Sequence, residues 1–273
     1  MSKVSESVIH AYDQTNRQGF VYRLLLEDSA FINLGYWHED TANAQDAGEN
    51  LVNEILKYIP KKNGRILDVA CGQGATTRHL CKYYDAANVV GINISVKQLQ
   101  ECRQIAPSCT FLEMDATNME FEDSSFDSAI CVEAAFHFDT RERFLAEACR
   151  ILKPGGRLVM ADIISTRFRG RTSLEPEANV VRDVDDYAAV CRRAGFADVE
   201  VVDVTDPVVG GYARHAGLVV RRRFPWLAAR PELLERYVRE VDRQWRGRTY
   251  VLVACVRPPE TSARAVRRGR VAA

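Results

Sequence analysis

A carboxylate stands directly ahead of a glycine turn in residues 66–75, ILDVACGQGA. The apolar residues around Asp68 are typical of a buried parallel strand, Gly72 and Gly74 break it, and residues 76–84 have the pattern of a helix. A strand, a glycine turn and a helix N-terminus together form a site for a cofactor that contains adenosine. Asp68 would repel a pyrophosphate and attract an ammonium group. The segment therefore favours S-adenosylmethionine, which carries an ammonium group and no phosphate.

Two further side chains that could move a proton follow predicted strands. His137 comes just beyond the apolar run at 126–133, and Asp162 lies near the end of the run at 157–163. The carboxyl ends of adjacent parallel strands open into one ligand crevice, so both side chains are expected there. If the methyl acceptor is a hydroxyl, a base must take its proton, and histidine has an ordinary pKa of about 6.5. The alternative for each residue is a structural hydrogen-bonding role.

Alternating strands and helices must position these residues. Strands are expected at residues 66–70, 88–94, 110–114, 126–133 and 157–163, and helices at 76–84, 96–105 and 144–152. Ser95 is the expected N-cap of the second of these helices, and residues 153–156, KPGG, are expected to form a turn after the third. The order of elements implies an α/β fold with a doubly wound parallel sheet.

These motifs resemble those of the class I S-adenosylmethionine-dependent methyltransferases, in the family's order and spacing. The signature elements are ILDVACGQG at 66–74, DA at 115–116, SFD at 125–127 and LKPGG at 152–156. The chain is similar more narrowly to small-molecule methyltransferases of natural-product pathways, including those that methylate sugar hydroxyls on macrolides and indolocarbazoles. That likeness rests on NLGYW at 33–37, GINIS at 91–95 with Gln98, and EAAFHF at 133–138.

The resemblance implies a Rossmann-like, mostly parallel, seven-stranded sheet with helical lid segments at the N-terminus and after the fifth strand. The last strand, at 249–256, is expected to lie antiparallel between two others. Four parts follow: an N-terminal helical lid at 1–60, a cofactor-binding core at 61–164, a lid and substrate segment with the last two strands at 165–257, and a disordered tail at 258–273.

The resemblance also implies how the cofactor is held. Asp68 would hold the ammonium, and the backbone at Gly72 and Gly74 would pass close to the cofactor because glycine has no side chain. Ala70 departs from the family's glycine pattern. Tyr36 would cover the methionine end of the cofactor.

The adenosine end departs from the common pattern. Many relatives carry an acidic residue at the end of the second strand, where this chain has Asn93 and Ile94. The relatives that share this pattern use a glutamine for the ribose hydroxyls, and Gln98 fits. Asp115 would accept a hydrogen bond from the adenine amino group, and the backbone of Ala116 would pair with a ring nitrogen.

Fewer sequence motifs indicate which residues contact the methyl acceptor. We place Glu133 near the cofactor. In the sugar O-methyltransferases that this chain resembles, a histidine and an aspartate act as a pair on the acceptor hydroxyl. We therefore predict His137 as the general base, with Asp162 orienting it or sharing its proton. No cluster of histidines and carboxylates predicts a metal ion.

Composition limits the partners. Thirty-seven basic residues balance 37 acidic ones, so nothing suggests a nucleic acid or an anionic membrane as partner. There is no 18-residue apolar run, so no membrane span is expected. The eight cysteines form no C-x-x-C pair, so we expect reduced thiols in a cytoplasmic protein. The expected partners are a small-molecule acceptor and further copies of the chain in a homo-oligomer. Lysine is absent after Lys153 while arginine is abundant there, which is either drift in composition or the junction of a chimera.

The leading hypothesis is methylation of a secondary-metabolite hydroxyl. The alternatives are a C- or N-methyltransferase, a cyclase or isomerase that uses the bound cofactor only as a charge or scaffold, and a non-catalytic subunit. A nicotinamide dehydrogenase is disfavoured, because Thr76 and Thr77 stand where the third glycine of a G-x-G-x-x-G motif is required.

Overall fold

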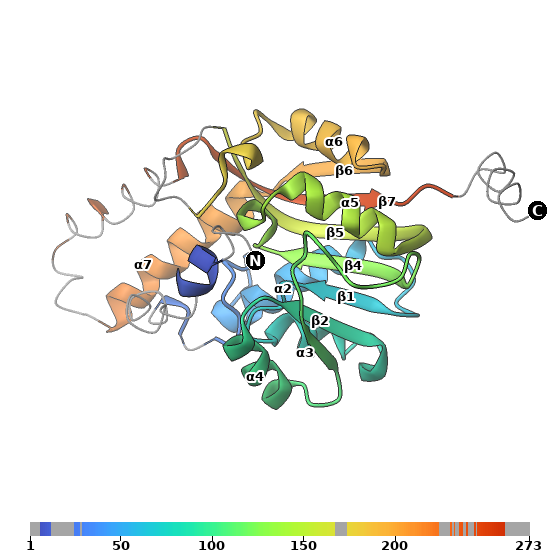
Figure 1. Cartoon of the computed structure of the whole chain (residues 1–273). Helices are drawn as coiled ribbons and strands as arrows, with labels where there is room; N and C mark the ends of the chain where they lie inside the picture. Colours follow the sequence, from blue (N-terminus) through green and yellow to red (C-terminus); the bar gives the residue numbers. More distant parts are fainter. Residues whose placement is uncertain are drawn as a thin grey trace, which may run out of the picture.

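The computed structural model describes residues 6–11, 25–27, 29–166, 174–223 and 245–259, with six single residues between 230 and 243. Its seven strands form one sheet in the order β3-β2-β1-β4-β5-β7-β6 (Figure 1). The strands are β1 (Ile66–Val69), β2 (Val89–Asn93), β3 (Thr110–Glu113), β4 (Phe126–Val132), β5 (Leu152–Ser165), β6 (Ala197–Asp203) and β7 (Arg248–Val256). The predicted doubly wound α/β fold is confirmed.

The strand directions follow the expected pattern. The strands from β1 to β5 pair in parallel, and β7 pairs antiparallel with both β5 and β6. The last strand therefore lies between two others, as the resemblance implied. All the carboxyl ends of β1 to β5 consequently meet at one edge of the sheet, where ligands bind in folds of this class.

Helices cover both faces of the sheet because the strands are apolar on both faces. The helices are α2 (Ala44–Lys57), α3 (Ala75–Leu80), α4 (Val96–Ile105), α5 (Arg141–Ile151), α6 (Val184–Arg193) and α7 (Gly211–Arg223). Helices α5 and α6 share one buried cluster with the sheet, and α2 and α3 share another. The helical residues 6–11 and α7 lie at the same end of the sheet (Figure 1).

Three local expectations can be compared directly with the structure. Ser95 caps α4 as predicted, because its hydroxyl accepts a hydrogen bond from the backbone of Gln98 at 3.2 Å. The helix after the glycine turn ends at Leu80, before the predicted 84. The third predicted helix ends at Ile151, before residues 153–156 as expected, and these residues form the irregular start of β5, where the register with β4 shifts and Gly155 has a φ of 77°.

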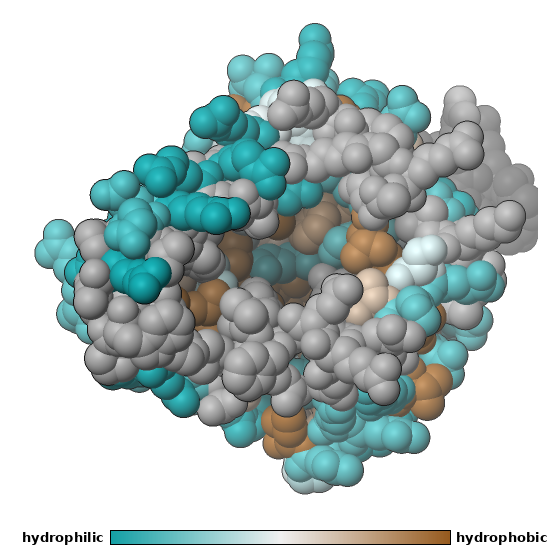
Figure 2. Space-filling view, turned by 90° about the vertical axis from the view of Figure 1, so that its left-hand side faces the viewer, coloured by the Kyte–Doolittle hydropathy of each residue, from teal (hydrophilic) through white to brown (hydrophobic). Residues whose placement is uncertain are grey.

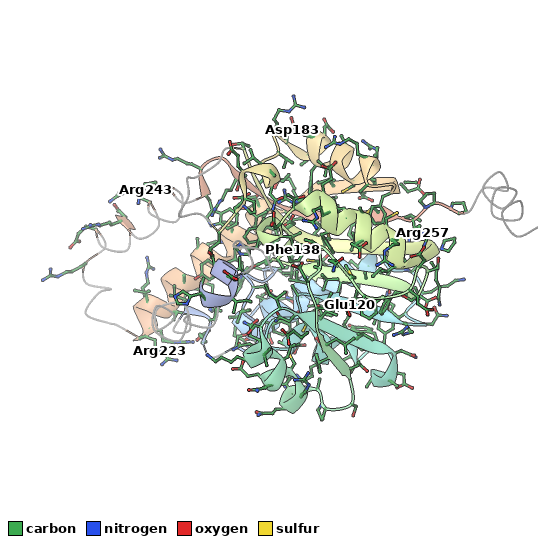
Figure 3. All side chains as sticks on the ribbon, viewed as in Figure 1. Glu120, Phe138, Asp183, Arg223, Arg243 and Arg257 are labelled. Carbon is green, nitrogen blue, oxygen red and sulfur yellow. The ribbon has the colours of Figure 1, made fainter. Side chains whose placement is uncertain are left out.

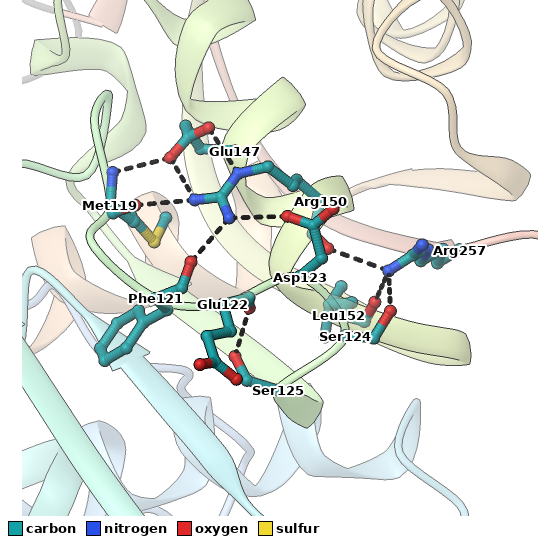
Figure 4. A network of polar contacts seen from close by, with 10 residues as sticks. All are labelled: Met119, Phe121, Glu122, Asp123, Ser124, Ser125, Glu147, Arg150, Leu152 and Arg257. Carbon is teal, nitrogen blue, oxygen red and sulfur yellow. Dashed lines mark hydrogen bonds and ion pairs between the residues drawn. The ribbon is translucent and has the colours of Figure 1, made fainter. Parts of the chain in front are cut away.

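The loop between β3 and β4 is fastened to α5 by one arginine (Figure 4). Arg150 donates to the carbonyls of Met119 and Phe121 at 2.7 and 2.6 Å and forms ion pairs with Glu147 and Asp123. A loop without its own secondary structure leaves carbonyls to be satisfied, and this guanidinium satisfies two of them. The network thereby fixes the course of the chain just after the predicted adenine-binding residues.

The predicted lids and tail are only partly described. Residues 6–11 are helical, whereas parts of the predicted segment at 165–257 and most of the predicted tail at 258–273 lie outside the described residues. Arg223 at the end of α7 and Arg257 after β7 lie on opposite sides of the molecule (Figure 3). Within the described part, no helix is long and apolar enough to cross a bilayer.

Candidate active site

A cavity opens at the carboxyl edge of the sheet, and Figure 2 shows the hollow with apolar side chains at its walls. Residues 8–9 and 30–33 contribute to its lining, as do the turns that follow β1, β2, β3 and β4. Ten of the thirteen predicted site residues line it: Asp68, Ala70, Gly72, Asn93, Ile94, Gln98, Asp115, Ala116, Glu133 and His137. The fold thus brings predicted site residues from positions 68 to 137 into the lining of one cavity.

The glycine turn forms because three of its residues have left-handed backbone angles. Ala70, Gly72 and Gly74 have φ of 56°, 54° and 90°. A side chain on Gly74 would come within 3.0 Å of the Cα atom of Cys102 in α4. Gly74 is the N-cap of α3 and is not among the residues that line the cavity. Its left-handed angle shapes the turn, and its approach to the cofactor stays a prediction.

Asp68 is a buried carboxylate at the bottom of the cavity. It is 1% exposed, and its Oδ2 atom accepts a hydrogen bond from the Thr77 hydroxyl at 2.6 Å. Burial raises the pKa of Asp68 to about 7, because the charged form loses hydration. A ligand with an ammonium group would compensate that charge, so the residue suits the methionine end of the cofactor.

Two amides organise the end of β2. The Nδ2 atom of Asn93 donates to Oε1 of Gln98 at 2.8 Å and to the carbonyl of Gly72 at 3.2 Å. Because Asn93 engages the oxygen of Gln98, the Gln98 amide group is oriented with its Nε2 donors available to ribose hydroxyls. Asn93 therefore orients the amide of Gln98, which stays the predicted partner of the ribose hydroxyls.

Asp115 is held in the loop after β3. Its Oδ1 atom accepts from both the backbone and the hydroxyl of Thr117, each at 2.8 Å. The carboxylate lines the cavity beside the buried Ala116. A carboxylate fixed in this way could accept a hydrogen bond from an exocyclic amine, as expected for adenine.

Glu133 follows β4 and joins three distant segments. Its Oε1 atom accepts from the backbone of Leu34 and from the Tyr250 hydroxyl, both at 2.8 Å. Burial raises the pKa of Glu133 to about 7, and these two donors partly oppose the rise. The carboxylate thus anchors the loop at 33–37 beside the cavity.

Tyr36 is not among the residues that line the cavity, and its contact with the cofactor stays a prediction. Its backbone N–H donates to the carbonyl of Ala47 in α2 at 2.8 Å, and its ring packs against His38. The neighbouring residues 30–33 line the cavity instead. The hydrogen bond from Leu34 to Glu133 directs this part of the loop inward, and Tyr36 lies beyond it.

His137 lines the cavity from the short 3₁₀ helix η2 (Ala135–His137). Its Nδ1 atom lies 3.0 Å from the carbonyl oxygen of Leu174. A carbonyl only accepts, so the ring carries its proton on Nδ1 and Nε2 is the basic nitrogen. Burial lowers the pKa of His137, outweighing the nearby charge of Asp162, which raises it. The imidazole is therefore neutral near pH 7.

Asp162 lies beneath His137 and outside the cavity lining. Its Oδ1 atom accepts from the backbone of Phe136 at 3.1 Å, and its Oδ2 atom accepts from Arg141 at 3.0 Å and from the Tyr187 hydroxyl at 2.5 Å. The side chain is fully buried. The expectation that it orients the His137 ring directly is therefore corrected: its contacts hold the backbone that carries the ring.

A family model described as a methyltransferase domain matches residues 67–160. The chain is 32% identical over 195 residues to the O-methyltransferase cnsE of Penicillium expansum, covering 65% of this chain and 69% of that protein. It is 30% identical over 225 residues to the erythromycin 3''-O-methyltransferase of Saccharopolyspora erythraea, covering 71% and 73%. The chain belongs to the class I S-adenosylmethionine-dependent methyltransferases.

The solved structures agree on the fold of this methyltransferase. The [4+2]-cyclase SpnF matches 93% of the methyltransferase and 96% of its own chain, with a TM-score of 0.68 and 21% identity. The geranyl diphosphate C-methyltransferase of Streptomyces coelicolor matches 94% and 98%, with a TM-score of 0.68 and 14% identity. One of these neighbours is a cyclase and the other a methyltransferase, so the fold alone does not fix the reaction.

The cofactor of the methyltransferase is S-adenosylmethionine, and the cavity fits it. Asp68 supplies a buried negative charge without a cationic partner among its contacts, and the turn at 70–74 brings main chain to the cavity. Among the described residues, no group of three histidines, cysteines or carboxylates is arranged to hold a metal ion.

Sequence reasoning missed the residues that support this site. They lie far along the chain from the groups they hold: Leu174, Asn179 and Tyr187 after β5, and Tyr250 in β7. The register that pairs Asp162 with Val251 brings β7 beside β5, and no local pattern reveals that pairing. Thr77 is different, because it follows the glycine turn by one helical turn and could have been found from that spacing.

Proposed function

We propose that this methyltransferase methylates a hydroxyl group of an uncharged small molecule, with His137 as the general base. When bound, S-adenosylmethionine supplies a methyl group on its sulfonium. Asp68 would hold the cofactor's ammonium group, Gln98 its ribose and Asp115 its adenine. The protein's main contribution is then to align the acceptor and to take its proton.

The contact of 3.0 Å between Nδ1 of His137 and the carbonyl oxygen of Leu174 is the observation that carries the proposal, because it assigns the tautomer of the ring. With the proton on Nδ1 and donated to Leu174, the nitrogen at the far side of the ring is the one that can accept a proton. The lowered pKa keeps that nitrogen unprotonated at neutral pH. A histidine with these two properties beside the cofactor cavity is prepared to act as a base.

The lining of the cavity supports an uncharged acceptor. It includes four carboxylates and, within the described part of the chain, no lysine or arginine. Among these described lining residues, a phosphorylated or carboxylated acceptor would meet repulsion from the carboxylates without a compensating cation. Apolar side chains, such as Val8, Ile9, Ile32 and Phe138, suit the hydrocarbon part of a secondary metabolite.

The His137→Asn variant tests the base. An asparagine retains a donor for the Leu174 carbonyl and lacks a basic nitrogen. We expect turnover of a hydroxyl acceptor to fall by about 10²- to 10⁴-fold, the usual contribution of general base catalysis. Cofactor affinity measured by calorimetry should change little, because His137 is not among the residues proposed to hold the cofactor.

Incubation with methyl-labelled cofactor and a panel of neutral acceptors distinguishes the candidate reactions. Labelled ether product together with S-adenosylhomocysteine supports the proposal. Label on carbon or nitrogen would replace the hydroxyl with another acceptor atom. Conversion of an acceptor without release of S-adenosylhomocysteine would favour a cyclase or isomerase. Unchanged turnover by His137→Asn at neutral pH would refute the role of His137.

A further inference from the structure

The turn that carries His137 is too short to be stable through its own hydrogen bonds. It is a single turn of 3₁₀ helix, and its internal hydrogen bonds are those from His137 to Ala134 and from Phe138 to Ala135. Helices this short are unstable without outside contacts. The orientation of the imidazole therefore depends on whatever binds the backbone on either side of it.

Asn179 binds that backbone on both sides of His137. Its Nδ2 atom donates to the carbonyl of Phe136 at 3.1 Å and to the carbonyl of Phe138 at 2.8 Å. Its Oδ1 atom accepts from the backbone N–H of Arg141, at the start of α5, at 2.7 Å. The partners fix the orientation of the amide, because carbonyls only accept and a backbone N–H only donates.

The side chain of Asn179 is 1% exposed, so these contacts are made away from water. An aspartate at this position would place an oxygen against two carbonyl oxygens. An alanine would leave two carbonyls and one N–H without their partner, which is costly in a buried place. The three contacts together require an amide of this length.

The ion pair of Asp162 and Arg141 also holds the backbone of the turn that carries His137. Asp162 accepts from the backbone N–H of Phe136, so Asp162 and Asn179 bind the two polar backbone groups of the same residue. Arg141 donates to Asp162, to the carbonyl of Ile163 at 3.1 Å and to the carbonyl of Asn179. Arg141 thus ties the Asn179 backbone to the end of β5.

We propose that Asn179 is the positioning residue of His137. It holds the 3₁₀ turn so that the Nδ1 proton meets the Leu174 carbonyl and Nε2 is presented to the acceptor. Leu174 and Asn179 both come from the segment between β5 and α6, so one segment sets both the place and the tautomer of the imidazole. The consequence for turnover rests on the proposed function of His137, whereas the consequence for the ring does not.

The test compares Asn179→Asp and Asn179→Ser with the natural protein. Asn179→Asp keeps the acceptor for Arg141 and loses the donors to the carbonyls of Phe136 and Phe138, while Asn179→Ser shortens the side chain. We expect kcat to fall by up to about a hundredfold, as for a small misplacement of a catalytic group, with cofactor affinity unchanged. The pH profile of kcat should also shift, since the environment of the imidazole changes.

Nitrogen-15 NMR of the histidine rings gives a readout that does not depend on turnover. The natural protein should show His137 as the Nδ1-protonated tautomer, and both Asn179 variants should show a mixture of tautomers. Arg150→Lys is the matched control. It disturbs an equally extensive network on the same helix α5, away from His137, and should lower thermal stability while leaving the tautomer and the pH profile unchanged.

The outcomes distinguish the two proposals. If His137→Asn keeps its turnover, the proposed base is wrong, and the NMR signal still decides whether Asn179 positions the ring. If either folded Asn179 variant keeps both the single tautomer and the natural kcat profile, the positioning role is overturned. If Arg150→Lys changes the tautomer as well, the effect is general loosening of α5, and the specific role of Asn179 is likewise overturned.

Discussion

Two carboxyl groups at the cavity, Asp68 and Glu133, have pKa values raised to about 7 by burial. A carboxyl group is ordinarily ionised throughout the neutral range, so these two are unusual in titrating where the enzyme works. Both face a cavity that takes a positively charged cofactor. Binding and protonation are therefore linked at this site.

We predict that cofactor affinity depends on pH through Asp68. The ammonium group favours the ionised carboxylate, so binding lowers the pKa of Asp68 and releases a proton at pH values between that lowered pKa and about 7. Affinity should be constant above that pH and should weaken below it, by up to about tenfold per pH unit for each proton released. Calorimetry in buffers of different ionisation enthalpy measures both the affinity and the proton count.

Asp68→Asn is the matched variant for this prediction, because it keeps the shape and the acceptor for Thr77. It should bind the cofactor more weakly and lose the part of the pH dependence that Asp68 causes. An affinity in the natural protein that stays constant from acidic to alkaline pH would contradict the linkage.

At the scale of elements, the predictable features were those set by neighbours in sequence. The five parallel strands, the glycine turn and the Ser95 cap each follow from residues within one element. The inclusion of residues 153–156 in β5 did not, because it depends on the backbone hydrogen bonds that Gly155 and Gly156 form with Arg257, far along the chain. The contacts of Asp162 could not be predicted for a similar reason, since its side-chain partners Arg141 and Tyr187 belong to α5 and α6.

The glycine turn gives a prediction at this scale. Gly74→Ala places a side chain at φ of 90° and within 3.0 Å of Cys102 in α4. We expect the free energy of unfolding to fall by roughly 1–3 kcal/mol, and the cofactor affinity to fall with it. Chemical denaturation and calorimetry measure the two effects.

Gly155→Ala is the control for backbone strain. Gly155 also has a positive φ, 77°, and a side chain there would meet nothing within 4 Å. The free energy of unfolding of this variant should fall only by the smaller amount that the positive φ causes, and its cofactor affinity should be unchanged. Equal effects of the two variants would show that the contact with α4 is unimportant.

At the scale of the whole molecule, the two ends of the chain complete a site whose centre lies between them. Glu133 receives one hydrogen bond from residue 34 and another from residue 250. The change from lysine to arginine after Lys153 falls inside β5, which pairs with β4 on one side and β7 on the other. A chimera joined there would have to preserve these contacts across the junction.

Tyr250→Phe tests this long-range connection. Removing the hydroxyl removes a donor that lowers the pKa of Glu133, so that pKa should rise further above its ordinary value. The free energy of unfolding should fall by about 1–3 kcal/mol above pH 7, where the carboxylate is charged, and by less in acid. Tyr83→Phe, at an exposed hydroxyl bonded to Asn53, should show no such difference between the two conditions.

The group that fixes the His137 proton is a main-chain carbonyl, that of Leu174. Every amino acid carries that oxygen, so replacing the leucine leaves the acceptor in place, whereas inserting or deleting a residue nearby would move it. During evolution, position 174 can therefore change its side chain to suit new acceptors, provided that its spacing to Asn179 stays constant. Catalysis should conserve spacing rather than residue type at position 174, and the amide itself at position 179.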